Sequence, residues 1–297
     1  MLDGFYCTNA LALASDANWA SKTRGSARLV NPDRSAQAAC HGIAMAFTSP
    51  DMPPRPAFIV AGMLSLFASC AAAAEERCIV IDAGHGGTSV LDESSPNNAT
   101  SASGAKEKDL TLELALAVFT VIRDSPAAKK AGIVPVLTRT ADVNVGMTDR
   151  ARVALSRSAR ALVSIHFNAS TNHTSRGPLG MVQDASHGNH NVARDGAYAN
   201  RLADAVSGVT RRYDSKSVRR DFITDRELKQ GRGSFLLRHL RADPRGQEIP
   251  ACFLEIEFID NPAVEAWLIR GEKAKAIRAE IAAALAAALI EYVAKGG

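Results

Sequence analysis

Three short apolar runs in this chain are each followed closely by a residue that can bind a metal or move a proton. The runs and these residues are Cys78–Ile81 with His85, Ala161–Ile165 with His166, and Cys252–Leu254 with Glu255. Short, uninterrupted apolar runs are typical of strands that are buried on both faces of a sheet. The sequence therefore predicts a buried sheet with polar residues at the ends of its strands.

Helical patterns separate these runs. The predicted helices are Leu110–Ile122 with Asp109 as N-cap, Thr148–Arg160 with Thr148 as cap, Ala197–Val206, and Lys273–Val293. Two further strands are predicted at Ile133–Leu137 and Gly180–Gln183, the first at a sheet edge because Pro135 cannot donate to a ladder. Strands that alternate with helices imply crossover connections. We expect a single three-layer α/β domain with a mostly parallel, twisted sheet and helices on both faces.

Ligands of such sheets bind at the carboxyl ends of the strands. His85, His166 and Glu255 would meet there, and Glu107 precedes the first predicted helix closely enough to join them. Two imidazoles and a carboxylate form a common ligand set of catalytic zinc. Each residue alone has a simpler interpretation, since a histidine at a strand end is often hydrogen-bonded in a turn and a glutamate before a helix favours its dipole. Spacing alone leaves both interpretations open.

Five blocks of the chain together resemble the type 3 family of zinc-dependent N-acetylmuramoyl-L-alanine amidases, which cleave peptidoglycan. The blocks are Ile79–Gly87, Glu107–Leu110, Leu137–Asp142 with Arg150 after it, Ser164–Ala169, and Phe253–Asn261. They follow one another in the order of the family, between about Cys78 and Val293. The combination is specific, although any single block is weak.

The resemblance implies that His85, Glu107 and His166 bind zinc and that Glu255 is the catalytic carboxylate. Zinc would activate water to hydrolyse the amide between N-acetylmuramic acid and L-alanine of the stem peptide. Two alternatives remain at this point. One is a zinc peptidase that acts on a cell-wall peptide bond, and the other is a non-catalytic cell-wall binding module.

The chain departs from the family pattern at two places. Glu257 stands where the family often has glycine, so it competes with Glu255 for the catalytic role. In a regular strand their side chains share a face about 6.5 Å apart, so reach along the strand has to distinguish them. The second departure is the charged segment 184–234, which we interpret as a solvated surface excursion. A substrate clamp, a regulatory lid or an autoinhibitory segment is the alternative.

The first 74 residues differ in character from the rest. Residues 52–74 contain Arg55, then an apolar stretch, then small residues, which is the pattern of a secretory signal peptide. Residues 1–51 are interpreted as a non-native or disordered upstream extension, and 75–297 as the catalytic domain. A periplasmic or secreted protein is expected. Cys70 lies in a loose lipobox, so a membrane-anchored lipoprotein is the alternative.

Charge and cysteine content limit the partners. The net charge is only +4 in 297 residues, which does not suggest a nucleic-acid partner. Peptidoglycan is the expected substrate, and the protein is expected to be a monomer. A protein that activates the enzyme remains an open alternative. Cys78 and Cys252 would remain after signal cleavage, either as a disulfide or as two buried thiols.

Overall fold

The computed structural model of the chain describes residues 76–297 except residue 227. The predicted upstream extension (1–51) and the predicted signal peptide (52–74) therefore lie outside the described residues. Within the described part, each helix is too short or too polar to cross a membrane.

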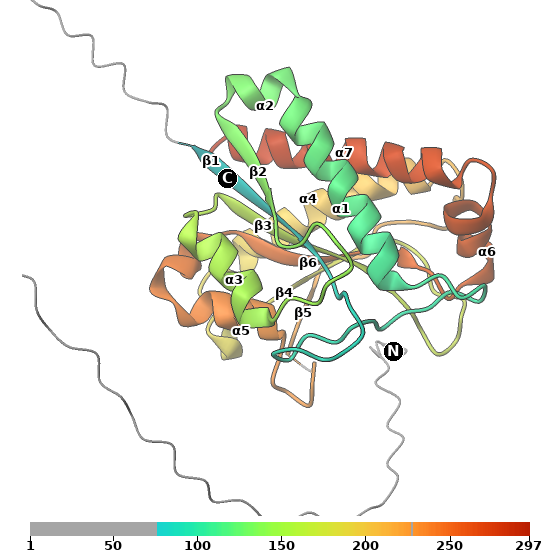
Figure 1. Ribbon diagram of the computed structural model, residues 1–297, viewed down its shortest axis with the longest axis horizontal. Coiled ribbons are helices and arrows are strands. Elements are labelled where there is room, and N and C mark those ends of the chain that lie inside the picture. Colours follow the sequence, from blue (N-terminus) through green and yellow to red (C-terminus); the bar gives the residue numbers. More distant parts are fainter. Residues whose placement is uncertain (1–75, 227) are drawn as a thin grey trace, which may run out of the picture. The chain divides into compact units, whose positions relative to one another are not determined.

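One six-stranded sheet forms the centre of the described region (Figure 1). Its strand order is β2-β1-β3-β6-β4-β5. The strands are β1 (Arg77–Ala83), β2 (Ile133–Leu137), β3 (Ala161–Asn168), β4 (Leu179–Val182), β5 (Ile223–Thr224) and β6 (Ala251–Phe258). All neighbours pair in parallel except β4 and β6, which are antiparallel. The largely parallel sheet is thus confirmed, and β2 with Pro135 lies at an edge as predicted.

Helices cover both faces of this sheet, which confirms the three-layer prediction (Figure 1). The α-helices are α1 (Glu107–Asp124), α2 (Pro126–Lys130), α3 (Met147–Ser156), α4 (Val192–Thr210), α5 (Phe235–Ala242), α6 (Pro262–Glu265) and α7 (Ala274–Ala294). Two 3₁₀ helices are η1 (Ala185–His187) and η2 (Pro244–Glu248), and η3 (Ala266–Arg270) is a π-helical turn. Helices α1, α4 and α7 pack on one face, and α3 and α5 pack on the other.

Successive side chains of the central strands enter different cores. Ile79 and Ile81 of β1 belong to the core under α1, α4 and α7, whereas Val80 belongs to the core under α3 and α5. All three are fully buried. Since side chains alternate between faces, a strand covered on both faces needs no polar positions, which explains the uninterrupted apolar runs.

The predicted start of the first helix is wrong. Helix α1 begins at Glu107 after Lys106 as N-cap, and not after Asp109. Lys106 makes no capping hydrogen bond through its side chain, and Asn97 Oδ1 instead accepts from the backbone N–H of Lys108. The earlier start makes Glu107 a residue of the helix and not of the preceding loop.

The second predicted helix is also displaced. Helix α3 begins at Met147 after Gly146, so Thr148 lies in its first turn and does not cap it. The side chain of Asp92 accepts from the backbone N–H of Thr148, at 2.8 Å. A cap from a residue so distant in sequence cannot be found by a local capping rule.

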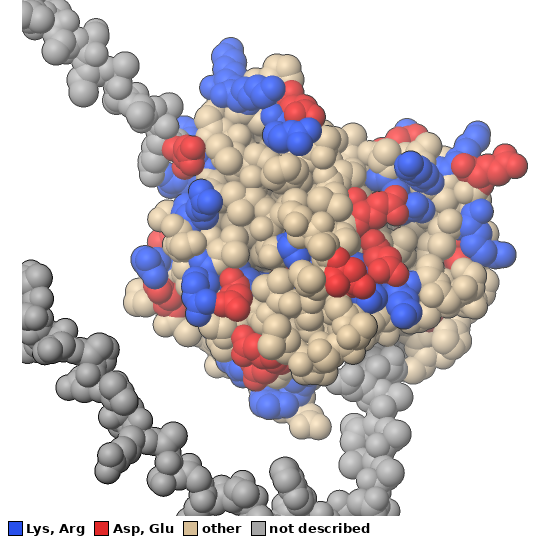
Figure 2. All heavy atoms as spheres, in the orientation of Figure 1, with Lys and Arg blue, Asp and Glu red and all other residues tan. Residues whose placement is uncertain are grey.

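The segment 184–234 is not a solvated surface excursion, and this prediction is corrected. It contains α4, in which Tyr198 and Leu202 are fully buried against the sheet. The charges that suggested an excursion include Arg211 and Arg212, which are exposed at the end of α4. On the face shown in Figure 2, basic and acidic side chains are interspersed.

Candidate metal centre and active-site cavity

The turn after β1 brings two imidazole rings together. His85 has a φ of 62°, and Gly86 and Gly87 have φ values of 132° and 63°, in the left-handed range that glycine tolerates best. A Cβ atom at Gly84 would lie only 2.4 Å from Cε1 of His166. Glycine at this position therefore lets the two rings approach to 4.9 Å between their centroids.

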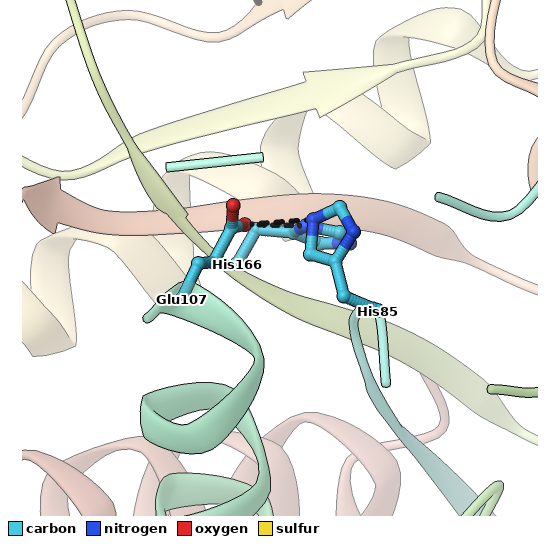
Figure 3. A group of neighbouring side chains, drawn as sticks. All are labelled: His85, Glu107 and His166. Atoms are coloured by element: carbon cyan, nitrogen blue, oxygen red, sulfur yellow. Dashed lines mark hydrogen bonds and ion pairs between the residues drawn. The ribbon is translucent and has the colours of Figure 1, made fainter. Parts of the chain in front are cut away.

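Three side chains from different elements meet at the carboxyl edge of the sheet (Figure 3). His85 follows β1, Glu107 is the first residue of α1, and His166 lies in β3. Oε1 of Glu107 lies 3.0 Å from Nε2 of His85 and 3.0 Å from Nδ1 of His166. All three side chains are buried, and one ligand atom from each lies within 4.8 Å of the others.

The ring nitrogens that face away from this group have partners of their own. Nδ1 of His85 lies 3.0 Å from the carbonyl oxygen of Ser95, and Nε2 of His166 lies 3.1 Å from Oγ of Ser164. Oγ of Ser95 also lies 3.0 Å from Nδ1 of His85, so Ser95 offers this nitrogen both a carbonyl oxygen and a hydroxyl group. Outer hydrogen bonds of this kind orient the histidines of metal sites.

The electrostatics of the group are those of a charged, buried cluster. Burial favours neutral Glu107, but the neighbouring imidazoles outweigh burial and hold the pKa of Glu107 well below its usual range. Burial opposes protonation of His85, yet the charge of Glu107 outweighs it and raises the pKa of His85. Burial lowers the pKa of His166. Glu107 is therefore a carboxylate with two imidazoles beside it.

These residues fit a divalent cation. Nε2 of His85 is buried and forms no hydrogen bond, although Oε1 of Glu107 is 3.0 Å away. In a neutral imidazole with its proton on Nδ1, the lone pair of Nε2 would point at this carboxylate oxygen, and a cation between the two atoms would be bound by both. Two imidazole nitrogens and one carboxylate also leave a coordination position for water or substrate.

A cavity of about 130 Å³ adjoins the group. The residues that line it include His85, Glu107, His166 and Glu255. The apolar residues that line it include Met147, Leu179, Met181, Ile223, Leu228, Phe235 and Phe253. The ring of Phe253 stacks on His166, with 4.6 Å between centroids. The structure thus brings all four predicted site residues to one cavity.

Glu255 contributes a carboxylate with an unused oxygen. The residue is half-buried in β6, and its Oε2 is buried without a hydrogen-bond partner among the described residues. Burial, and then the negative charge of Glu107, raise the pKa of Glu255 well above its usual value. A carboxyl group with a raised pKa in a cavity is suited to accepting and returning a proton.

Glu257 has different surroundings because β6 is not regular. A bulge makes the three steps from Glu255 to Phe258 span only two steps of β3. Oε2 of Glu257 accepts from the backbone N–H groups of Gly177 (2.8 Å) and Phe258 (2.9 Å), and Glu257 is not among the residues that line the cavity. The expectations of a strand that ends at Glu255 and of two carboxylates on one regular face are therefore wrong.

A second buried polar cluster lies beside the first. Asp82 of β1 accepts from Nη1 of Arg150 (2.5 Å), from Oγ1 of Thr138 (2.5 Å) and from Oγ of Ser164 (2.5 Å). Arg150 also donates to the carbonyl oxygen of His85 at 2.8 Å. The sequence matched Arg150 to the family pattern without a role, and the structure shows that it fixes the turn that carries His85.

Ser164 contacts both clusters, and its place in the sequence pattern assigned it no role. Its Oγ donates to Asp82 and lies beside Nε2 of His166, so it joins the two clusters. The sequence did contain a signal for this contact, because Ser164 and His166 are two positions apart in a predicted strand and therefore share a face. A hydroxyl two positions before a metal-binding histidine can orient that histidine.

Cys78 and Cys252 are free, buried thiols. They lie in β1 and β6, which β3 separates in the sheet. Burial raises the pKa of Cys78 to about 11 and that of Cys252 well above its usual value. Of the two alternatives for this pair, the structure has the thiols and not the disulfide.

The fold and the site together define an α/β protein with a buried side-chain group, at the carboxyl edge of its sheet, that could hold a metal. Comparison with protein families identifies the class further. The model of the N-acetylmuramoyl-L-alanine amidase family matches residues 79–287. The chain belongs to this family, and it is a peptidoglycan amidase that cleaves the bond between N-acetylmuramic acid and L-alanine. The resemblance of the five sequence blocks is confirmed.

Individual relatives agree with this assignment. The chain is 26% identical over 237 residues to the N-acetylmuramoyl-L-alanine amidase AmiA of Salmonella typhimurium, and equally to AmiA of Escherichia coli, covering 73% of this chain and 76% of each relative. Its fold is similar to that of an N-acetylmuramoyl-L-alanine amidase from Clostridium difficile 630, with a TM-score of 0.53 and 26% identity over 75% of this chain and all (100%) of that one. The fold, and the fold alone, is also similar to that of the amidase AmiC2 of Nostoc punctiforme, with a TM-score of 0.52 at 22% identity over 73% of this chain and 97% of AmiC2.

Proposed function

We propose that this amidase is a zinc enzyme in which His85, Glu107 and His166 bind the metal and Glu255 is the catalytic base. The observation that carries the proposal is the convergence of three buried donor groups, with the Nε2 of His85 left without a hydrogen bond. Zinc is preferred because two imidazoles and one carboxylate are a set typical of hydrolytic zinc. When bound, zinc would supply a Lewis acid that polarises the amide carbonyl and makes water a better nucleophile.

Residues of the chain would supply proton transfer, exclusion of water and positioning of the imidazoles. Glu255 takes a proton from the attacking water through its carboxylate and returns it to the leaving nitrogen of L-alanine. The apolar walls of the cavity, among them Phe253 and Met181, exclude bulk water from the reacting amide. The contacts of Ser95 and Ser164 with the outer nitrogens hold both imidazoles in place.

We also propose that the enzyme acts outside the cytoplasm. The support is the signal-like stretch at 52–74 together with a substrate that is cell-wall material. Residues 75–297 would then be the mature catalytic domain, soluble and monomeric. In the alternative, the mature chain would start at Cys70 and carry a lipid anchor there. N-terminal sequencing of the exported protein tests this, and a mature chain that starts before Met52 would contradict it.

Digestion of purified peptidoglycan sacculi tests the chemistry. Mass spectrometry is expected to show free stem peptides with an L-alanine amino terminus and glycan with intact lactyl groups. A chelator should abolish release, and added zinc should restore it. Cleavage within the stem peptide would instead support the zinc peptidase alternative, and full activity in the chelator would overturn the zinc proposal.

A further inference from the structure

One wall of the cavity comes from the loop between β5 and α5. Leu228, Lys229, Gly233 and Ser234 of this loop line the cavity, as does Phe235 at the start of α5. The loop belongs to the segment without a clear counterpart in the family pattern. The loop and the proposed metal ligands line the same cavity, so residues of the loop are placed to contact a bound substrate.

A buried carboxylate holds this loop in place. Asp225 is fully buried and accepts from the backbone N–H groups of Asp184 (2.7 Å) and Ser234 (2.5 Å). The ring of His187 lies between Oδ1 of Asp225 and the carbonyl oxygen of Gly231, with both contacts at 2.9 Å. The loop is therefore tied to the sheet at both ends and near its tip.

The tip of the loop has a conformation that costs free energy. Lys229 and Gln230 have φ values of 50° and 58°, and neither is glycine. Two successive residues in the left-handed region are uncommon and are retained where the surroundings impose them, often at ligand-binding sites. The anchored loop thus presents Lys229 to the cavity in one defined conformation.

The charge of Lys229 is unusual for this cavity. Among the described lining residues, Glu93, Glu107 and Glu255 are acidic, and Lys229 is the one lysine or arginine. Glu93 is already paired with Arg238 at 2.8 Å, and Glu107 lies beside the two imidazoles. Lys229 forms no ion pair with any residue in the described part of the chain, so its ammonium group is free to bind an anion.

The substrate carries an anion at a suitable place. In the stem peptide, L-alanine is followed by an acidic residue, and the carboxylate of that residue is about two residue lengths, or roughly 7 Å, beyond the scissile amide. We propose that Lys229 is a specificity residue that binds this carboxylate and distinguishes it from its amide. The inference rests on the proposed assignment of this cavity as the substrate site.

Competition with labelled sacculi tests the proposal whether or not the soluble compound is cleaved. The two competitors are the γ-amide of N-acetylmuramoyl-L-alanyl-D-glutamate, which keeps the α-carboxylate free, and the diamide, in which that one carboxylate is also amidated. Wild-type enzyme should bind the carboxylate form about fivefold more tightly, as expected for one partly exposed ion pair, and salt should reduce the difference. Lys229→Met should remove this preference, Lys229→Arg should keep it, and Lys275→Met, which changes an exposed lysine of α7, should not alter it.

The outcomes separate this proposal from the assignment of the site. Equal weakening of both competitors by Lys229→Met would mean that Lys229 only shapes the loop, and this would overturn the proposal. The proposal would also be overturned if the wild-type enzyme bound the two competitors equally tightly. Wild-type activity in Glu255→Gln would instead overturn the site assignment itself. Zinc content and circular dichroism of each variant establish that the fold and metal site are intact.

Discussion

Two buried polar clusters lie side by side at the carboxyl edge of this sheet, and they differ in one respect. In the cluster around Asp82, both carboxylate oxygens are hydrogen-bonded, to Arg150, Thr138 and Ser164. In the cluster of His85, Glu107, His166 and Glu255, two buried atoms have no partner, Nε2 of His85 and Oε2 of Glu255.

The difference separates support from chemistry. A buried polar atom without a partner costs free energy, so such an atom at a cavity is a candidate for contact with a ligand. The Asp82 cluster is complete within the chain, and it stabilises the turn that carries His85. The other cluster is incomplete until a cation and a substrate bind. Predictions can therefore be made separately for the two clusters.

The largest effect is expected from removing a proposed metal ligand. His85→Ala and His166→Ala each leave only two protein ligands, so zinc content and amidase activity should both be lost. Atomic absorption on purified protein and digestion of sacculi measure the two properties. Full zinc occupancy in either variant would show that the wrong ligand has been named.

Glu255→Gln should keep zinc and lose activity. Gln cannot accept the proton of the attacking water, and removal of a general base lowers the rate by at least about a hundredfold. Zinc content and thermal unfolding should remain close to wild type, which distinguishes this variant from the ligand variants. Turnover of sacculi by the zinc-loaded protein is the measurement, and near wild-type turnover would remove Glu255 from the catalytic role.

Asp82→Asn tests the cluster around Asp82, in which both carboxylate oxygens are hydrogen-bonded. It should lower the stability of the fold more than it lowers zinc binding. The change leaves the buried guanidinium of Arg150 without its charge partner, and breaking a buried pair in this way costs about 3–5 kcal/mol of unfolding free energy. Chemical denaturation measures this loss. At low temperature, where the variant is still folded, zinc should bind. Unchanged stability would show that the cluster does not support the fold.

The smallest effect is expected at Glu257, which serves as the matched control for Glu255. Burial raises the pKa of Glu257 above 4.5, so the folded state holds this proton more tightly than the unfolded chain. The resulting stabilisation is present below about pH 4.5 and is lost as the pH rises through the raised pKa. Glu257→Gln should therefore keep activity and become more stable relative to wild type as the pH rises over this range.

Denaturation at several pH values, together with turnover of sacculi, tests the Glu257 prediction. A difference in stability that does not change with pH would contradict it. If Glu257→Gln is inactive while Glu255→Gln remains active, the roles of the two carboxylates must be exchanged.

The sequence alone determined five of the strands, four of the longer helices and the residues that meet at the edge of the sheet. The apolar runs of β1, β3 and β6 are readable because a strand buried on both faces excludes polar residues along its whole length. Pro135 placed β2 at an edge for an equally local reason. His85 and His166 could be brought together from topology, since the carboxyl ends of parallel strands lie at one edge.

The tertiary structure decided what depends on contacts between distant segments. The bulge in β6 separates the surroundings of Glu257 from those of Glu255, and no local pattern marks it. Asp92 caps α3 from another loop, and Asp225 fixes Lys229 at the cavity wall through bonds to Asp184 and Ser234. Hydrogen bonds of this kind join residues far apart in sequence, so they are set by how the folded chain packs and not by the order of neighbouring residues.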